Sequence, residues 1–161
     1  MEKTKVKFLE NLLYEEEDTD ALLRAIESID DVDVLFVYAY HYNWDDGFNV
    51  PQQILQNPYC DLSTALLIFD LADGDKKMWN EIVWGEGSIT GDSIHFAEHK
   101  EFMLNLYTDL MDEKFKEPSI DYSLCSNCSE ARINWIREKR PNVPEVFIEG
   151  VRGKVLVLPS I

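Results

Sequence analysis

Two histidines and a glutamate have a spacing, His95-x-x-Glu98-His99, that can support metal chemistry. Residues four apart lie on one side of a helix, so His95 and His99 could supply two imidazole ligands to zinc. Glu98 could then act as a general base on a metal-bound water. The pattern marks no third ligand, and short patterns recur by chance. We therefore favour a second interpretation, in which His99 borders the apolar helix face beside Phe96 and Met103.

The pair Cys125-x-x-Cys128 also has the spacing of a metal or redox site. Zinc sites of this kind usually contain a second pair, and the sequence has only one other cysteine, Cys60. A redox pair would be expected at a helix start that follows a strand, and no such alternation surrounds this one. We interpret both as ordinary thiols, and the odd number of cysteines predicts a reducing, cytoplasmic setting.

Five aspartates could meet around calcium or magnesium if helix ends converge, because these cations prefer oxygen ligands. They are Asp45, Asp46, Asp70, Asp73 and Asp75. The alternative is that they cap helices and form a solvated acidic rim. We favour the alternative because the chain contains 31 acidic residues, so that acidic clusters are expected by chance. The sequence thus predicts no cofactor.

Net charge is the strongest global signal: 31 acidic and 15 basic residues give −16 at pH 7. Such a chain repels phosphate and anionic lipid, which argues against a nucleic-acid or membrane-surface partner. No apolar run approaches the roughly 18 residues of a membrane span. A basic protein would be attracted instead. The candidate binding face consists of the acidic residues Glu15, Glu16, Glu17, Asp18, Asp30, Asp31, Asp45 and Asp46.

These residues must be positioned mainly by helices, because apolar residues recur at helical spacing along the chain. One stripe lies in residues 6–13 and a second in residues 22–29. Further helices are predicted over residues 52–56, 62–71, 76–84, 94–115 and 130–139. Asp18, Asp20, Asp30, Asp31 and Asp61 stand just before apolar-periodic stretches, where a carboxylate can cap a helix.

Two segments are ambiguous. Residues 32–42 are rich in β-branched and aromatic side chains, which favours a strand, but the following stretch to Gly47 is typical of a helix C-terminus. We predict a helix there. Residues 146–148 and 155–158 are apolar runs separated by two glycines, a pattern that indicates a hairpin. The predicted fold is therefore mainly α: a single compact multi-helix domain over residues 1–161 with a small C-terminal β-hairpin.

Residues 42–47 read Tyr-Asn-Trp-Asp-Asp-Gly, and residues 61–66 read Asp-Leu-Ser-Thr-Ala-Leu. These two blocks resemble a known bacterial family, catalogued as domain of unknown function 4274. The resemblance covers roughly residues 30–110 and implies a helical domain, with no activity to carry over. Its shared polar residues Asn43, Asp45, Asp46, Asp61 and Asp73 are explained as well by helix ends as by a site.

Three functions follow from these observations. The first is a non-catalytic protein-binding module in the bacterial cytoplasm that engages a basic partner, as an immunity protein does with a nuclease-type toxin. The second is a metal-dependent hydrolase built on His95 and His99. The third is a structural helical domain without chemistry. We favour the first because the polar residues are predicted at helix caps rather than in one convergent set. No pattern in the chain specifies an oligomeric state.

Overall fold

The computed structural model describes residues 1–72, 94–125, 129–139, 141 and 143–161, with only the backbone described at 94–96 and 132. All regular secondary structure in these residues is helical, which confirms the predicted class. The helices are α1 (Lys3–Tyr14), α2 (Thr19–Glu27), α3 (Val32–His41), the 3-10 turn η1 (Trp44–Asp46), α4 (Asn49–Gln56), α5 (Leu62–Leu71), α7 (Ile94–Met111), α8 (Glu130–Lys139) and α9 (Val146–Glu149).

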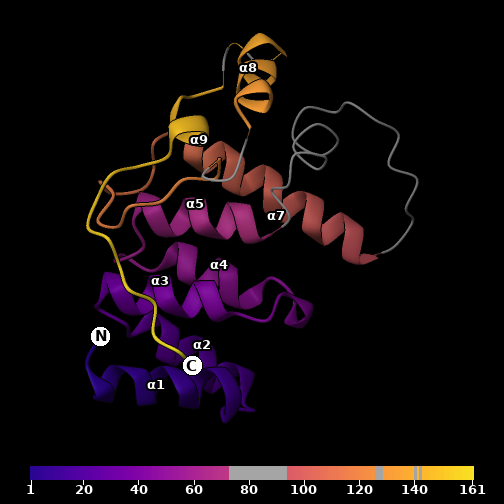
Figure 1. Cartoon of the computed structure of the whole chain (residues 1–161). Helices are drawn as coiled ribbons and strands as arrows, with labels where there is room; N and C mark the ends of the chain where they lie inside the picture. Colours follow the sequence, from indigo (N-terminus) through magenta and orange to yellow (C-terminus); the bar gives the residue numbers. More distant parts are fainter. Residues whose placement is uncertain (73–93, 126–128, 140, 142) are drawn as a thin grey trace.

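The helices stack in layers, with α1 and α2 at one side, α3, α4 and α5 in the middle, and α7 beyond them (Figure 1). Helix α3 packs on α1 and α5, α2 packs on α4, and α5 packs on α7. Helices α3 and α5 are apolar nearly all round, as helices enclosed by others must be. Tyr38 and Phe69, at 1% and 0% exposure, are among their largest buried side chains. This enclosure explains why residues 32–41 form a helix although their composition favours a strand.

Three of the aspartates predicted to cap helices do so. The Asp18 carboxylate accepts the main-chain N–H groups of Asp20 and Ala21 at the start of α2. Asp31 caps α3 and Asp61 caps α5 in the same way. A side-chain acceptor at this position satisfies amides that have no partner within the helix, so the local sequence sets these three helix starts.

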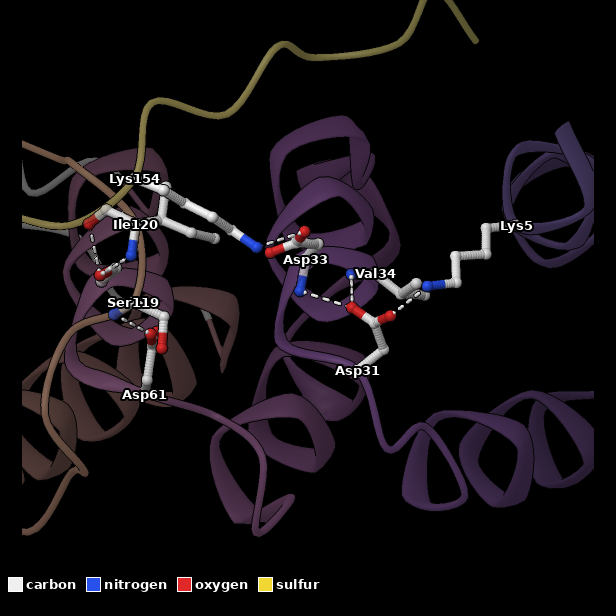
Figure 2. A network of polar contacts seen from close by, with 9 residues as sticks. Lys5, Asp31, Asp33, Val34, Asp61, Ser119, Ile120 and Lys154 are labelled. Carbon is white, nitrogen blue, oxygen red and sulfur yellow. Dashed lines mark hydrogen bonds and ion pairs between the residues drawn. The ribbon is translucent and has the colours of Figure 1, made fainter. Parts of the chain in front are cut away.

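Polar contacts tie the ends of the chain to the central helices (Figure 2). Lys5 of α1 pairs with Asp31 at 2.5 Å, and Lys154 pairs with Asp33 at 2.6 Å. The start of α3 is therefore held by lysines from two segments that are distant in the sequence. The hydroxyl of Ser63, in the first turn of α5, donates to the carbonyl of Ile120 at 2.7 Å.

The predicted C-terminal hairpin is wrong. Residues 146–149 form the short helix α9, and no strand occurs in the part of the chain that the structure describes. A helical turn buries Phe147 and Ile148 while its own main chain supplies hydrogen bonds, as from Gly150 N to Val146 O at 3.0 Å. Isolated bridges join Val151 to Tyr122 and Lys154 to Ile120. A short apolar run does not distinguish a strand from a buried helical turn, which is why the pattern misled.

Three predicted boundaries also change. Helix α7 ends at Met111 instead of residue 115, and Glu113 beyond it has a left-handed φ of 53°. Helix α3 ends at His41, and Gly47, with φ 86°, closes the separate turn η1. Helix α4 begins at Asn49 rather than at residue 52, with proline in its first turn. The predicted helix 76–84 lies outside the described residues.

Candidate functional site

Four carboxylates from two parts of the chain surround one surface hollow. Asp45 and Asp46 come from η1, and Glu98 and Glu101 come from α7. We call this site the acidic hollow. It has a volume of about 470 Å³, and its lining is completed by Gly47, Phe48, Asn49, Gln52 and Phe102.

The turn that carries Asp45 and Asp46 is fixed by two local hydrogen bonds. The Asn43 side chain accepts the Asp45 main-chain N–H at 3.3 Å, and the Tyr42 phenol donates to the Gly47 carbonyl at 2.9 Å. Burial, and then the neighbouring Asp46 charge, raises the pKa of Tyr42 to about 12. The phenol therefore stays protonated, and able to donate, far above neutral pH.

The other wall of the acidic hollow is one face of α7. Glu98, Glu101 and Phe102 follow the three- and four-residue spacing that puts side chains on the same side of a helix. Phe102 is 2% exposed and stacks on Phe48, with ring centroids 4.9 Å apart. This aromatic contact joins α7 to the segment that follows η1, and so holds the two pairs of carboxylates around one space.

All four carboxylates are exposed and open to an incoming cation. None of them takes part in an ion pair among the described residues, whereas Asp31, Asp33, Asp109 and Glu145 each do. Uncompensated carboxylates around a hollow concentrate negative potential there, because the protein on either side excludes water. The arrangement can bind a cationic group.

His99 lies on the inner side of α7, next to the acidic hollow. Its ring stacks on Phe48 at 5.2 Å, with an angle of 14° between the planes. Its Nε2 is 2.8 Å from the carbonyl oxygen of Ala72. A carbonyl can only accept, so Nε2 carries the proton and its lone pair is not available to a metal. The position agrees with the predicted apolar border, with Met103 buried one turn later at 1% exposure.

No group of three or more metal-ligating side chains occurs among the residues whose side chains are described. The side chain of His95 lies outside that set, so its proposed role as a ligand stays a prediction. Cys128, Asp73 and Asp75 also lie outside the described residues. The thiol of Cys60 is buried, which raises its pKa and makes it a poor nucleophile. Asp70 accepts the Tyr122 hydroxyl at 2.5 Å.

The structure distributes the eight candidate acidic residues over three places. Glu15, Glu16, Glu17 and Asp18 join α1 to α2, and Asp30 and Asp31 join α2 to α3. Asp45 and Asp46 follow α3, a helix of ten residues and about 15 Å in length that begins directly after Asp31. Asp18 and Asp31 are engaged as caps, and Asp31 also pairs with Lys5. The pair on η1 meets two further carboxylates at the acidic hollow, whereas Glu15 lines a separate hollow with Glu10, beside Lys7.

Sequence reasoning missed Glu101 and gave Glu98 a different role. The signal that could have found them is the spacing of Glu98, Glu101 and Phe102, which predicts a mixed acidic and aromatic helix face. Nothing in the sequence indicates that this face meets η1, because the two segments are about 50 residues apart and join through the packing of Phe48 on Phe102.

In comparisons with known proteins, residues 30–87 match the model of a family described as a domain of unknown function (DUF4274). The match confirms the resemblance seen in the sequence blocks, over a shorter range than residues 30–110. It includes Asp45 and Asp46 but stops before Glu98 and Glu101. No curated protein and no solved structure matches the chain.

Within the described residues, no helix is both long enough and apolar enough to cross a membrane. The long helix α7 illustrates this, because Glu98, Lys100 and Glu101 fall within its first half. Hydrocarbon does not tolerate such a run of charges.

Proposed function

We propose that this protein is a non-catalytic binding module whose acidic hollow takes up a basic segment of a protein partner. The observation that carries the proposal is the convergence of Asp45, Asp46, Glu98 and Glu101, from two elements, around one hollow without ion-pair partners among the described residues. The net charge of −16 would steer such a partner toward the site over a distance.

Arginine fits the acidic hollow better than lysine does. Its planar guanidinium can pair with two carboxylate oxygens at once, whereas an ammonium acts as a point charge. Its methylene stem can also lie against the half-buried Phe48 ring at the edge of the hollow. Each exposed ion pair contributes only about 0–1 kcal/mol, so the proposed affinity depends on several contacts made together.

The partner segment can extend beyond the acidic hollow. A second hollow of about 480 Å³ shares Gln52 and Phe102 with it and continues between α4 and α7, past Leu55, Gln56 and Asn105. Amide side chains there offer donors and acceptors to a peptide main chain. We therefore infer that the partner contributes a segment with arginine at one end rather than one isolated side chain.

The biological setting that we propose is the bacterial cytoplasm, with a basic toxin of the nuclease type as the partner. Small size and strong negative charge support this, since such a protein can cover a positively charged active site. The odd number of cysteines and the buried Cys60 thiol are in keeping with a reducing compartment.

The proposal is tested by titrating the protein with fluorescent hexa-arginine. The variant Asp46→Asn/Glu101→Gln removes two charges from the acidic hollow with little change in shape. At about 0.5 kcal/mol for each contact, binding should weaken about fivefold. The matched control, Glu17→Gln/Asp30→Asn, removes two exposed charges elsewhere and should change binding by less than about twofold, through net charge alone.

Two outcomes contradict the proposal. Equal loss of hexa-arginine affinity in both double variants would show that the peptide responds to the net charge of the protein and does not bind at the acidic hollow. Binding that persists at about 1 M salt, where charges are screened beyond about 3 Å, would show that ionic contacts do not hold it. Hexa-lysine should bind more weakly than hexa-arginine, since its ammonium groups cannot form paired contacts with a carboxylate.

A further inference from the structure

The segment after the last glycine of the chain is an extended run of alternating side chains. Val155 and Val157 are 82% and 80% exposed, while Leu156 and Leu158 are partly buried against the hydrophobic core. Alternation with a period of two is the signature of a strand lying flat on a surface. In Figure 1 this segment runs from α9 past the central helices toward α2.

One edge of this segment is in use near its start. The N–H of Lys154 donates to the carbonyl of Ser119 at 2.9 Å, and the carbonyl of Lys154 accepts from the N–H of Asp121 at 3.0 Å. In an extended chain, successive residues direct their main-chain groups to opposite edges. The N–H and C=O groups of Val155 and Val157 therefore point away from residues 119–121.

That second edge has no hydrogen-bond partner among the described residues. None of the hydrogen bonds among the described residues involves the main chain of residues 155–161. An unpaired edge flanked by exposed valines is a template for another strand. Its length is limited by Gly153 on one side and by Pro159, which has no N–H, on the other.

We propose that two copies of this chain pair through this edge as antiparallel strands centred on Leu156. In this register Val155 of each copy faces Val157 of the other, and the two valine pairs exchange four main-chain hydrogen bonds. Opposed residues point to the same face, so both copies of Leu156 keep their contacts with their own cores. A shift by one residue would place Val157 opposite the inward-facing Leu156 and lose this match.

The local charge allows a second copy to occupy this edge, and the run Val155-Leu156-Val157 is self-complementary when two copies meet antiparallel. Residues 150–161 contain no Asp or Glu, so two highly acidic chains meet here without opposing carboxylates. In the proposed register Lys154 faces Leu158 and Arg152 faces Ser160, so no like charges stand opposite each other. The ladder is short and buries far less surface than a permanent dimer, so the association should be weak and reversible.

Sedimentation equilibrium from micromolar to millimolar protein tests the pairing. We expect a monomer–dimer equilibrium whose dimer fraction rises from about 0.01 M to about 1 M salt, because salt screens the repulsion between the two acidic chains. Binding to the acidic hollow should weaken over the same range, so failure of one proposal is distinguishable from failure of the other.

Val157→Pro removes an N–H from the ladder, and this N–H makes no hydrogen bond within the described part of the chain. The fixed φ of proline suits an extended chain. It should abolish the dimer and leave the melting temperature unchanged. The matched control Val157→Thr keeps both the N–H and the β-propensity, and should retain the dimer. The pairing is refuted if Val157→Pro dimerises as the parent chain does. It is equally refuted if the parent chain stays monomeric at millimolar concentration in high salt.

Discussion

The carboxylate of Asp61 accepts the main-chain N–H of Ser119 at 2.6 Å, across 58 residues of sequence (Figure 2). Its other oxygen accepts the N–H and the hydroxyl of Thr64 at 3.0 and 3.1 Å. One side chain, 2% exposed, thus begins α5 and anchors the segment that follows α7.

Asp61→Ala should be among the most destabilising polar substitutions in the chain. It removes a helix cap, worth about 1 kcal/mol, and leaves buried amides without an acceptor at about 1–3 kcal/mol. The expected loss of unfolding free energy is therefore about 2–4 kcal/mol, measured by urea denaturation. Asp61→Asn keeps one acceptor oxygen and should lose less; a loss as large as that of alanine would contradict this account.

The side chain of Asn57 binds main-chain carbonyl groups at the C-terminal end of α2, and Asn57→Asp should destabilise the fold by removing these bonds. The buried amide nitrogen donates to the carbonyls of Ile26 at 2.8 Å and Ile29 at 2.9 Å. Aspartate has the same shape but places an acceptor against these acceptors, so we expect a loss of about 2–3 kcal/mol in thermal or urea unfolding. Asn105→Asp on the exposed face of α7 is the matched control, expected within about 0.5 kcal/mol.

The Lys5–Asp31 pair makes stability depend on acid pH. Burial alone raises the pKa of Asp31, but the hydrogen bonds from Lys5, Val34 and Asp33 outweigh it, and the pKa falls below the ordinary 3.8. A carboxyl group whose pKa is lower in the folded state stabilises the fold above pH 3.8, and this contribution is lost as the pH falls further. Lys5→Gln should reduce the acid sensitivity of the melting temperature as the pH falls below 3.8, the ordinary pKa of the group. An unchanged pH profile in the variant would contradict the assignment.

Alkaline pH should destabilise the fold through Tyr42. Its pKa rises from 10.0 to about 12, first because the phenol is buried and then because Asp46 is near. A phenol whose pKa is higher in the folded state stabilises the fold below pH 10, and this contribution is lost as the pH rises toward 12. Thermal unfolding followed across this range should show the decline.

Tyr42→Phe separates the hydrogen bond from the titration. The variant leaves the Gly47 carbonyl without its donor, which should cost about 1 kcal/mol at pH 7 and loosen the turn that carries Asp45 and Asp46. It should also flatten the stability decline between pH 10 and pH 12, the range between the ordinary and the raised pKa of Tyr42. Stability equal to that of the parent at neutral pH would contradict the role of this bond.

Local physics makes much of this fold readable in the sequence. Asp18, Asp31 and Asp61 begin their helices with hydrogen bonds to main-chain groups two or three residues away. The local sequence therefore suffices to predict these helix starts. The helical spacing of apolar residues likewise predicts α1 and α2, because burial of one face needs no knowledge of the partner. Start and stop signals, such as Asp61 before α5 and Pro141 after α8, predict the other two.

Tertiary structure decided what the sequence leaves open. Residues 146–149 fold as a helix because one helical turn buries Phe147 and Ile148 while its own main chain supplies the hydrogen bonds. Glu101 joins Asp46 at one hollow only because Phe48 stacks on Phe102. The open edge at Val155 and Val157 follows from the bonds of Lys154 to Ser119 and Asp121. Each of these three features depends on contacts between segments that are distant in the sequence. The energies of such contacts cannot be predicted from a local sequence pattern.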